Sequence, residues 1–110
     1  MRKKIVRLED LPEGTTKRFS FQRDGMRVDA FVANFKGDIV AYENLCRHLP
    51  ITLDYGDGEF FSSDGSLFVC QTHGAFYEPE TGLCIDGPCT GASLIPLETE
   101  QSDGHIFLVR

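Results

Sequence analysis

The sequence predicts an all-β fold made of many short antiparallel strands. Apolar and polar residues alternate with a period of two along several short runs, which is typical of strands that bury one face. Dipeptides suited to tight turns recur between these runs. No stretch of more than ten residues keeps a helical period between capping signals. Together these observations favour strands joined by tight turns over a helical or mixed fold.

The first predicted hairpin lies near the N-terminus. In residues 18–22, Phe19 and Phe21 share one side of the strand, and in residues 26–32 the apolar side chains again take alternate positions. The dipeptide Asp24-Gly25 stands between the two runs and suits the positive backbone angles of a two-residue hairpin turn. Similar breaks follow at Lys36-Gly37-Asp38, Asp64-Gly65 and Asp103-Gly104.

Two further strand-like runs, residues 38–42 and 66–69, each end just before a segment that contains a cysteine and a histidine. Between them, residues 53–66 are rich in Gly, Asp and Ser, so we expect a long excursion from the body of the fold. We expect its aromatic residues to pack against that body, with a short strand at 59–61, and an exposed docking role is the alternative. These aromatic residues are Tyr55, Phe60 and Phe61.

The composition indicates one small acidic domain. The chain has 110 residues, 41% of them hydrophobic and 25% charged, which is enough for one modest core, so we expect a single domain over residues 1–110. Lys and Arg total 11 against 17 Asp and Glu, and this formal charge of −6 disfavours nucleic acid and favours protein partners with basic faces. The apolar runs are far too short to span a bilayer, and the charges around Ile5 and Val6 leave no apolar segment for a signal peptide. We therefore expect a cytoplasmic protein that does not act in a membrane.

Two short pairs of cysteine and histidine are candidate metal ligands. Cys46 and His48 are separated by one residue, and Cys70 and His73 by two. Such spacings let a loop turn both side chains toward one centre, and each pair follows a predicted strand. In a reducing compartment, cysteines are more often metal ligands or buried thiols than a disulfide framework. Because two of the three histidines stand this close to a cysteine, we expect the two loops to hold one metal site.

The residues around these pairs resemble the cluster-binding motif of Rieske-type ferredoxins and Rieske domains. The matching residues are Cys46, His48, Cys70, His73, Gly74, Phe76-Tyr77, Thr81-Gly82 and Gly87-Pro88. The resemblance implies a three-sheet antiparallel β-sandwich with two cluster-binding loops and one [2Fe-2S] cluster per chain. It implies that Cys46 and Cys70 bind one iron, and that His48 and His73 bind the other iron, nearer to solvent. The Gly87-Pro88 turn resembles the third loop of the family, which covers the cluster.

Departures from the motif imply a low redox potential. High-potential respiratory members carry an extra cysteine in each cluster loop and a serine two residues after the second histidine. Here neither loop has the extra cysteine, the serine position is Ala75, and a glycine position of the first loop is Pro50, which has no N–H. Tyr77 does match the tyrosine of that motif. Fewer donors leave the reduced cluster less stabilised, so we expect a potential toward the low end of the Rieske range, about −150 to +300 mV.

The excursion is expected to add negative charge beside the cluster. Its acidic residues are Asp54, Asp57, Glu59 and Asp64. They would lower the potential further and guide a basic partner, and a merely solvated loop is the alternative.

Three residues stand outside the ligand set that the resemblance implies. Cys84 and Cys89 could form a small disulfide, extend the metal site or fill space, and we favour buried or half-buried thiols because the ligand set is complete without them. The third histidine, His105, follows a turn and is expected at the surface. Farther back in the chain, Pro96 limits residues 94–97 to an edge strand or a strand end.

The sequence therefore favours an electron carrier over an enzyme. No nucleophile with an oriented base, flavin motif or mononuclear iron site stands out in the sequence. We expect a one-electron transfer protein that acts as a ferredoxin between a reductase and an oxygenase, or as a small redox subunit of a nitrite-reductase-type enzyme. The alternative is a structural zinc-binding interaction module, because two cysteines and two histidines also form a tetrahedral zinc set.

Overall fold

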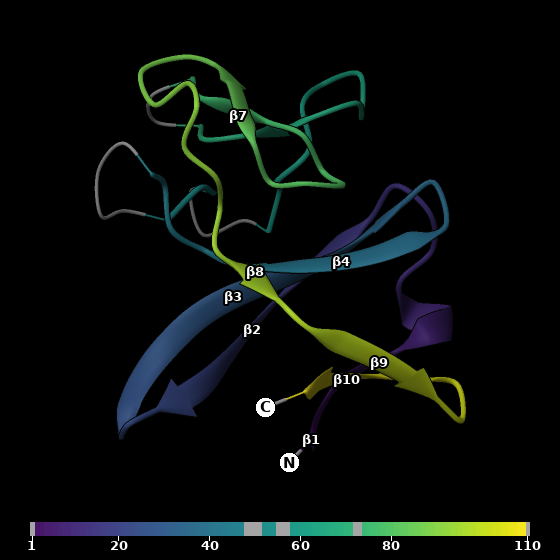
Figure 1. Ribbon diagram of the computed structural model, residues 1–110. Helices are drawn as coiled ribbons and strands as arrows, with labels where there is room; N and C mark the ends of the chain where they lie inside the picture. Colours follow the sequence, from purple (N-terminus) through teal and green to yellow (C-terminus); the bar gives the residue numbers. More distant parts are fainter. Residues whose placement is uncertain (1, 48–51, 55–57, 72–73, 110) are drawn as a thin grey trace.

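The computed structural model describes residues 2–47, 52–54, 58–71 and 74–109, which form three antiparallel sheets (Figure 1). The all-β class and the three-sheet architecture expected from the sequence are confirmed. A short 3-10 helix, Leu8–Asp10, follows the first strand. The strands are β1 (Arg2–Arg7), β2 (Thr16–Arg23), β3 (Met26–Phe35), β4 (Asp38–Glu43), β5 (Phe68–Val69), β6 (Phe76–Tyr77), β7 (Cys84–Asp86), β8 (Pro96–Leu97), β9 (Thr99–Ser102) and β10 (His105–Val109).

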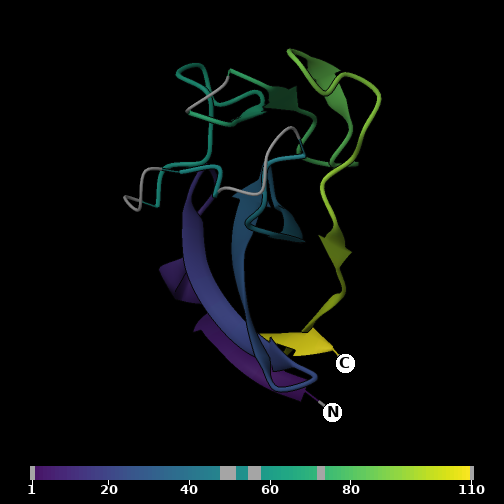
Figure 2. The ribbon, with the colours of Figure 1, turned by 90° about the vertical axis from the view of Figure 1, so that its left-hand side faces the viewer.

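The four-stranded sheet lies between the two smaller ones. Its strand order is β2-β3-β4-β8, and the other sheets have the orders β1-β10-β9 and β5-β6-β7. In Figures 1 and 2 the sheet with β1, β9 and β10 lies at the end of the molecule that holds both termini. The sheet with β7 lies at the opposite end in both views. Strand β5, which ends directly before Cys70, belongs to this sheet and so lies at the end of the molecule opposite both termini.

The hairpin expected near the N-terminus is confirmed as β2 and β3. The two strands pair antiparallel up to Arg23 and Met26, so the two-residue turn is Asp24-Gly25. Asp24 has φ of 52° and Gly25 has φ of 77°, the positive angles that this turn requires. Both strands extend beyond the runs in which polar and apolar residues alternate.

Strand β3 is buried on both faces over its second half. Phe31 and Ala33 pack into the hydrophobic cluster beneath the small sheet. Val32 points the other way, into the cluster formed with Val6 and Ile106 of the terminal sheet. Successive side chains of a strand point to opposite faces, so a strand between two sheets becomes continuously apolar instead of alternating. This explains why the sequence pattern identifies only the first half of β3 as a strand with one exposed face.

The excursion packs against the body of the fold through its aromatic residues, as expected. The ring of Phe60 stacks on that of Phe31 with centroids 4.0 Å apart, and Phe61 lies 5.1 Å from Phe68. The strand predicted at 59–61 is wrong, because only an isolated bridge joins Phe61 to Phe68. Two backbone hydrogen bonds, from Ser62 N–H to the Leu67 carbonyl and from Val69 N–H to the Phe60 carbonyl, hold this segment together with the rings. Tyr55 lies outside the described residues.

Two other predicted strands have shorter or shifted bounds. The run at 66–69 forms a strand only at Phe68–Val69, because the Ser66 backbone N–H and hydroxyl both donate to Asp64 and complete a turn there. The proline-containing strand β8 pairs with β4 at the edge of its sheet, which confirms the expected effect of Pro96. Because β8 is followed almost directly by β9, it also connects the middle sheet to the terminal one.

Candidate metal centre

A buried asparagine closes the base of the first candidate loop. The Asn44 side chain accepts a hydrogen bond from the Leu53 backbone N–H, 2.8 Å away, and donates to the Asp54 carboxylate at 3.0 Å. Cys46, only 2% exposed, comes two residues after Asn44, beyond the end of β4. The two ends of the segment that carries Cys46 and His48 are thus fastened together. Sequence reasoning missed Asn44, whose signal was a polar side chain at the end of a buried strand.

Asp54 belongs to this internal fastening and does not form part of an exposed acidic face. It is 3% exposed, accepts a hydrogen bond from the Gly58 backbone N–H and lies 3.5 Å from the Arg18 guanidinium. Burial on its own would raise the pKa of the Asp54 carboxyl, but the hydrogen bonds from Asn44 and Gly58 and the charge of Arg18 together hold that pKa below its ordinary value. The expectation that Asp54 adds charge at a docking surface is therefore wrong. Glu59 and Asp64 are exposed, and Asp57 lies outside the described residues.

Replacing Asp54 by asparagine is expected to lower the free energy of unfolding by about 1–2 kcal/mol near neutral pH, because the buried carboxylate loses charged hydrogen bonds. A carboxyl with a lowered folded pKa contributes stability above its unfolded pKa of about 3.9 and loses it as the pH falls through the folded value. The difference in the free energy of urea unfolding between wild type and D54N should therefore disappear as the pH falls below about 4. Asp38→Asn, which removes the same charge from an exposed position, is the control. A gap that stays constant from pH 7 to pH 3 would contradict the assigned role.

The second candidate loop is a tight turn closed on itself. The Cys70 backbone N–H donates to the Ala75 carbonyl at 2.9 Å, and the Gly74 N–H donates to the Cys70 carbonyl at 2.8 Å. Gly74 has φ of 71°, which a residue with a side chain rarely adopts. The Gln71 N–H donates to the Leu53 carbonyl and so ties this loop to the base of the first one. Cys70 is fully buried.

Tyr77 connects the first loop to the small sheet. From β6 its hydroxyl accepts a hydrogen bond from the Arg47 backbone N–H at 3.1 Å and lies 3.7 Å from the Cys46 sulfur. Burial, followed by the hydrogen bond with Cys89, raises the pKa of Tyr77, so the hydroxyl keeps its proton. A protonated hydroxyl in this position can donate to the Cys46 sulfur.

A third segment presses on the second loop at Gly87. A Cβ atom at this position would lie 2.7 Å from the Ala75 Cα and 3.1 Å from the Gly74 carbonyl oxygen. Only a residue without a side chain allows so close an approach, and Gly87 also has φ of 104°. The glycine of the Gly87-Pro88 turn therefore packs directly over the loop that contains Cys70.

The two predicted sulfur ligands share one buried environment. Cys46 and Cys70 belong to the same hydrophobic cluster, and neither forms a disulfide bond. The predicted nitrogen ligands, His48 and His73, lie outside the described residues. Among the described residues no group of three metal-ligating side chains comes together, which is consistent with half of the predicted set lying outside them. Two buried thiols on two fastened loops fit a metal group that requires two thiolate ligands.

Of the other residues singled out from the sequence, Cys84 and Cys89 pack in the same hydrophobic cluster as Cys46 and Cys70, whereas His105 belongs to the terminal sheet. Cys84 is buried and Cys89 half-buried, and both are free thiols as favoured from the sequence. His105 begins β10 and is half-buried, and its ring lies 3.1 Å from the Asp103 carbonyl oxygen. It is therefore less exposed than expected.

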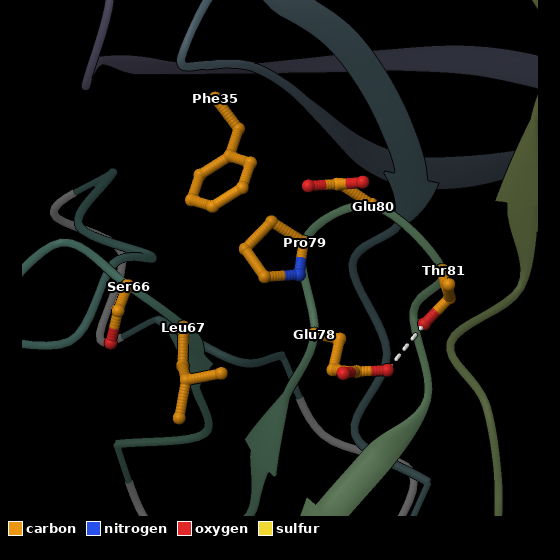
Figure 3. A pocket seen from close by; sticks show the side chains of 7 residues that line it. All are labelled: Phe35, Ser66, Leu67, Glu78, Pro79, Glu80 and Thr81. Carbon is orange, nitrogen blue, oxygen red and sulfur yellow. Dashed lines mark hydrogen bonds between the residues drawn. The ribbon is translucent and has the colours of Figure 1, made fainter.

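One cavity lies at the end of β3, beside the turn that follows β6 (Figure 3). It holds about 220 Å³ and is lined by Phe35, Ser66, Leu67, Glu78, Pro79, Glu80 and Thr81. Within it the Thr81 hydroxyl donates to the Glu78 carboxylate at 3.0 Å. Its lining contains neither sulfur nor imidazole, so it does not belong to the metal centre.

No helix among the described residues is long and apolar enough to cross a membrane.

Comparison with known proteins identifies the family to which the chain belongs. The family model for the Rieske [2Fe-2S] domain matches residues 1–101. The menaquinol:cytochrome c reductase iron-sulfur subunit of Geobacillus thermodenitrificans is 29% identical over 94% of this chain. The chain spans 66% of the length of that relative.

Solved structures share the fold over almost the whole chain. One is from a complex of reduced oxygenase and oxidized ferredoxin in carbazole 1,9a-dioxygenase, with 25% identity, a TM-score of 0.75 and coverage of 97% of this chain and 91% of that chain. The ferredoxin of carbazole 1,9a-dioxygenase from Nocardioides aromaticivorans IC177 has a TM-score of 0.72 at 19% identity, covering 98% of this chain and 96% of that chain. With the match to the family model, the chain belongs to the Rieske [2Fe-2S] domain family, and it transfers single electrons through one [2Fe-2S] cluster.

Proposed function

We propose that Cys46 and Cys70 bind one iron of the cluster and that His48 and His73 bind the other. The observation that carries this proposal is the burial of two cysteine side chains on two loops that Asn44 and Gln71 fasten to the same residue, Leu53. Two thiolates on one iron and two imidazoles on the other form the ligand set of this family.

The protein residues around the two sulfurs exclude water and supply hydrogen bonds. When bound, the cluster supplies one-electron redox chemistry. The Tyr77 hydroxyl lies 3.7 Å from the Cys46 sulfur, and a hydrogen bond donated to this sulfur as a ligand would stabilise the additional negative charge of the reduced state. Gly74 and Gly87 keep the second loop compact and covered.

The potential belongs at the low end of the range for Rieske centres, about −150 to +300 mV. Ala75 is fully buried and has no hydroxyl group that could donate to the cluster. Hydrogen bonds to the sulfurs stabilise the reduced cluster and raise its potential. A chain with alanine at this position therefore has a lower potential than a member of the family with serine there.

The single domain over residues 1–110 acts as an electron carrier rather than as an enzyme. Its place is between a reductase and an oxygenase, or in a nitrite-reductase-type enzyme as a small redox subunit. The similarity to a chain from an oxygenase–ferredoxin complex supports the first role. None of the four cysteines forms a disulfide bond in the described structure, which suits a cytoplasmic location, where thiols stay reduced.

The partners have basic faces and dock on an acidic protein that binds neither nucleic acid nor membranes. The net charge of −6 supports this assignment. The rate of electron transfer from the reduced protein to a small basic redox protein is expected to fall as ionic strength rises, because salt screens the attraction. The measurement is stopped-flow oxidation at increasing salt. A rate independent of salt would rule out charge as the basis of docking.

Anaerobic reductive titration tests the proposed function. The purified protein should contain about two irons and two acid-labile sulfides per chain and should take up one electron, with bleaching of its visible absorption. Cys46→Ser and Cys70→Ser should lose the cluster, whereas Cys84→Ser should keep it. A colourless protein with one zinc ion would instead support the structural zinc module.

A further inference from the structure

Cys84 and Cys89 lie opposite each other across one closed loop. Their sulfur atoms are 3.3 Å apart, and neither is bonded to another cysteine. The loop is held by two backbone hydrogen bonds, from Gly91 N–H to the Cys84 carbonyl and from Cys84 N–H to the Ala92 carbonyl. A disulfide bond is about 2.05 Å long, so closing this pair requires the sulfurs to move together by little more than 1 Å.

The pair is in contact with the tyrosine of the cluster site. The Tyr77 hydroxyl lies 3.2 Å from the Cys89 sulfur and 3.7 Å from the Cys46 sulfur, while its oxygen accepts the Arg47 N–H. A tyrosine hydroxyl has one hydrogen to donate, so the two sulfurs compete for it. The Cys89 sulfur is the nearer of the two.

We propose that Cys84 and Cys89 form a reversible dithiol–disulfide pair whose oxidation shifts the Tyr77 hydrogen bond toward Cys46. The formation of the disulfide stands on the geometry of the two cysteines alone. The effect on the cluster rests on the proposed function, in which Cys46 is a ligand.

The oxidant is a low-molecular-weight disulfide, and the chemistry is thiol–disulfide exchange. Cys89, half-buried at the edge of the loop, attacks one sulfur of the oxidant as its thiolate, and the first small thiolate leaves. Cys84 then gives up its proton, attacks the Cys89 sulfur and displaces the second small thiolate. Two protein thiols are oxidised by two electrons, and the small disulfide is reduced to two thiols.

The order of these steps follows from burial. Burial, followed by the interaction with Cys89, raises the pKa of Cys84 to about 11, so Cys84 remains a thiol until the mixed disulfide is beside it. Cys84 is buried, whereas Cys89 has the greater access to solvent. Cys89 therefore reacts first and Cys84 resolves the mixed disulfide.

Oxidation changes what Tyr77 can bind. As the disulfide forms, the Cys89 sulfur moves toward Cys84 and becomes part of the S–S bond. A disulfide sulfur is a poor hydrogen-bond acceptor, which leaves the Cys46 sulfur as the better acceptor for the Tyr77 hydroxyl. A stronger donor on a ligand sulfur stabilises the reduced cluster, so the midpoint potential rises.

The first test counts thiols in the holoprotein. The protein is equilibrated anaerobically in mixtures of oxidised and reduced glutathione, quenched in acid, unfolded, alkylated and weighed by mass spectrometry. Four alkyl groups per chain are expected under reducing conditions and two under oxidising ones, with a cross-linked peptide that joins Cys84 to Cys89. Cys84→Ser should instead leave Cys89 with one attached glutathione. Four alkyl groups at every ratio, or a cross-link to another cysteine, would overturn the pair.

The second test measures the midpoint potential of the cluster in both states of the pair. An upward shift on oxidation is expected in wild type, and none in Cys84→Ser or in Tyr77→Phe. If the disulfide forms and the wild-type midpoint potential stays constant, the proposed effect of the pair on the cluster through Tyr77 is wrong. The reversible pair of Cys84 and Cys89 is then still supported. If the protein lacks iron, the proposed function fails, and the thiol count still decides on the pair.

Discussion

Replacing Gly87 by alanine is expected to destabilise the protein by about 3 kcal/mol or more and to release the cluster. The added Cβ would lie 2.7 Å from the Ala75 Cα, which belongs to the backbone and cannot move aside as a flexible side chain could. The positive φ of Gly87 adds strain of about 1–3 kcal/mol, and overpacking against a buried loop adds a similar amount. Because the loop that is pushed carries Cys70, we expect the absorbance of the cluster to be lost at temperatures that the wild type tolerates.

Gly91→Ala provides the matched control for this change. Gly91 also has a positive φ, of 96°, but a Cβ there would meet nothing within 4 Å. Its replacement by alanine is expected to lower stability by about 1–2 kcal/mol from backbone strain alone and to leave the cluster in place. Thermal unfolding and the iron content of both variants make the comparison. Equal effects of the two substitutions would show that the contact with Ala75 is not what matters at Gly87.

Replacing Tyr77 by phenylalanine is expected to lower the midpoint potential of the cluster. The change removes the hydroxyl that lies 3.7 Å from the Cys46 sulfur and that accepts the Arg47 N–H. A hydrogen bond with a net free energy of about 0.5–1.5 kcal/mol, made mainly in the reduced state, corresponds to about 20–60 mV for one electron. Stability should also fall by about 1–3 kcal/mol, because the Arg47 N–H loses its acceptor in a partly buried position.

Tyr42→Phe separates the redox effect from the loss of a buried hydroxyl. The Tyr42 hydroxyl is also buried and donates its one hydrogen to the Pro79 carbonyl at 2.8 Å, so it has none left to donate to a cysteine sulfur. This variant should lose stability without a change of potential. Spectroelectrochemical titration of wild type and both variants distinguishes them. An unchanged midpoint potential in Tyr77→Phe would show that the Tyr77 hydroxyl does not influence the potential of the cluster.

Local sequence patterns predicted those strands that have one exposed face. The Asp24-Gly25 turn and the alternation on both sides of it define β2 and the first half of β3, because a two-residue turn and a one-sided strand are local properties. Strand β1 was missed. Its residues Arg2–Arg7 are mostly charged, and they form a strand because β10 pairs with them from the far end of the chain.

The residues of the candidate site that belong to short sequence motifs could be predicted. The spacing of cysteine and histidine identifies Cys46 and Cys70, and the resemblance to a family identifies Gly87 and Tyr77. The structure explains why glycine and tyrosine stand at these two positions, since Gly87 packs against the second loop and the Tyr77 hydroxyl accepts the Arg47 N–H. The fastening by Asn44 and the ion pair of Arg18 with Asp54 could not be predicted in this way. These contacts join distant residues, and an aspartate in a polar loop has the same sequence signal whether it is solvated or buried.

Electron paramagnetic resonance of the protein reduced under anaerobic conditions tests the central claim most directly. A [2Fe-2S] cluster held by two thiolates on one iron and two imidazoles on the other should give a rhombic signal whose mean g value lies below that of the free electron. The signal should integrate to one spin for each pair of irons. A mean g value near that of clusters with four cysteine ligands, or no signal in a protein that contains only zinc, would contradict the assignment of His48 and His73 together with Cys46 and Cys70.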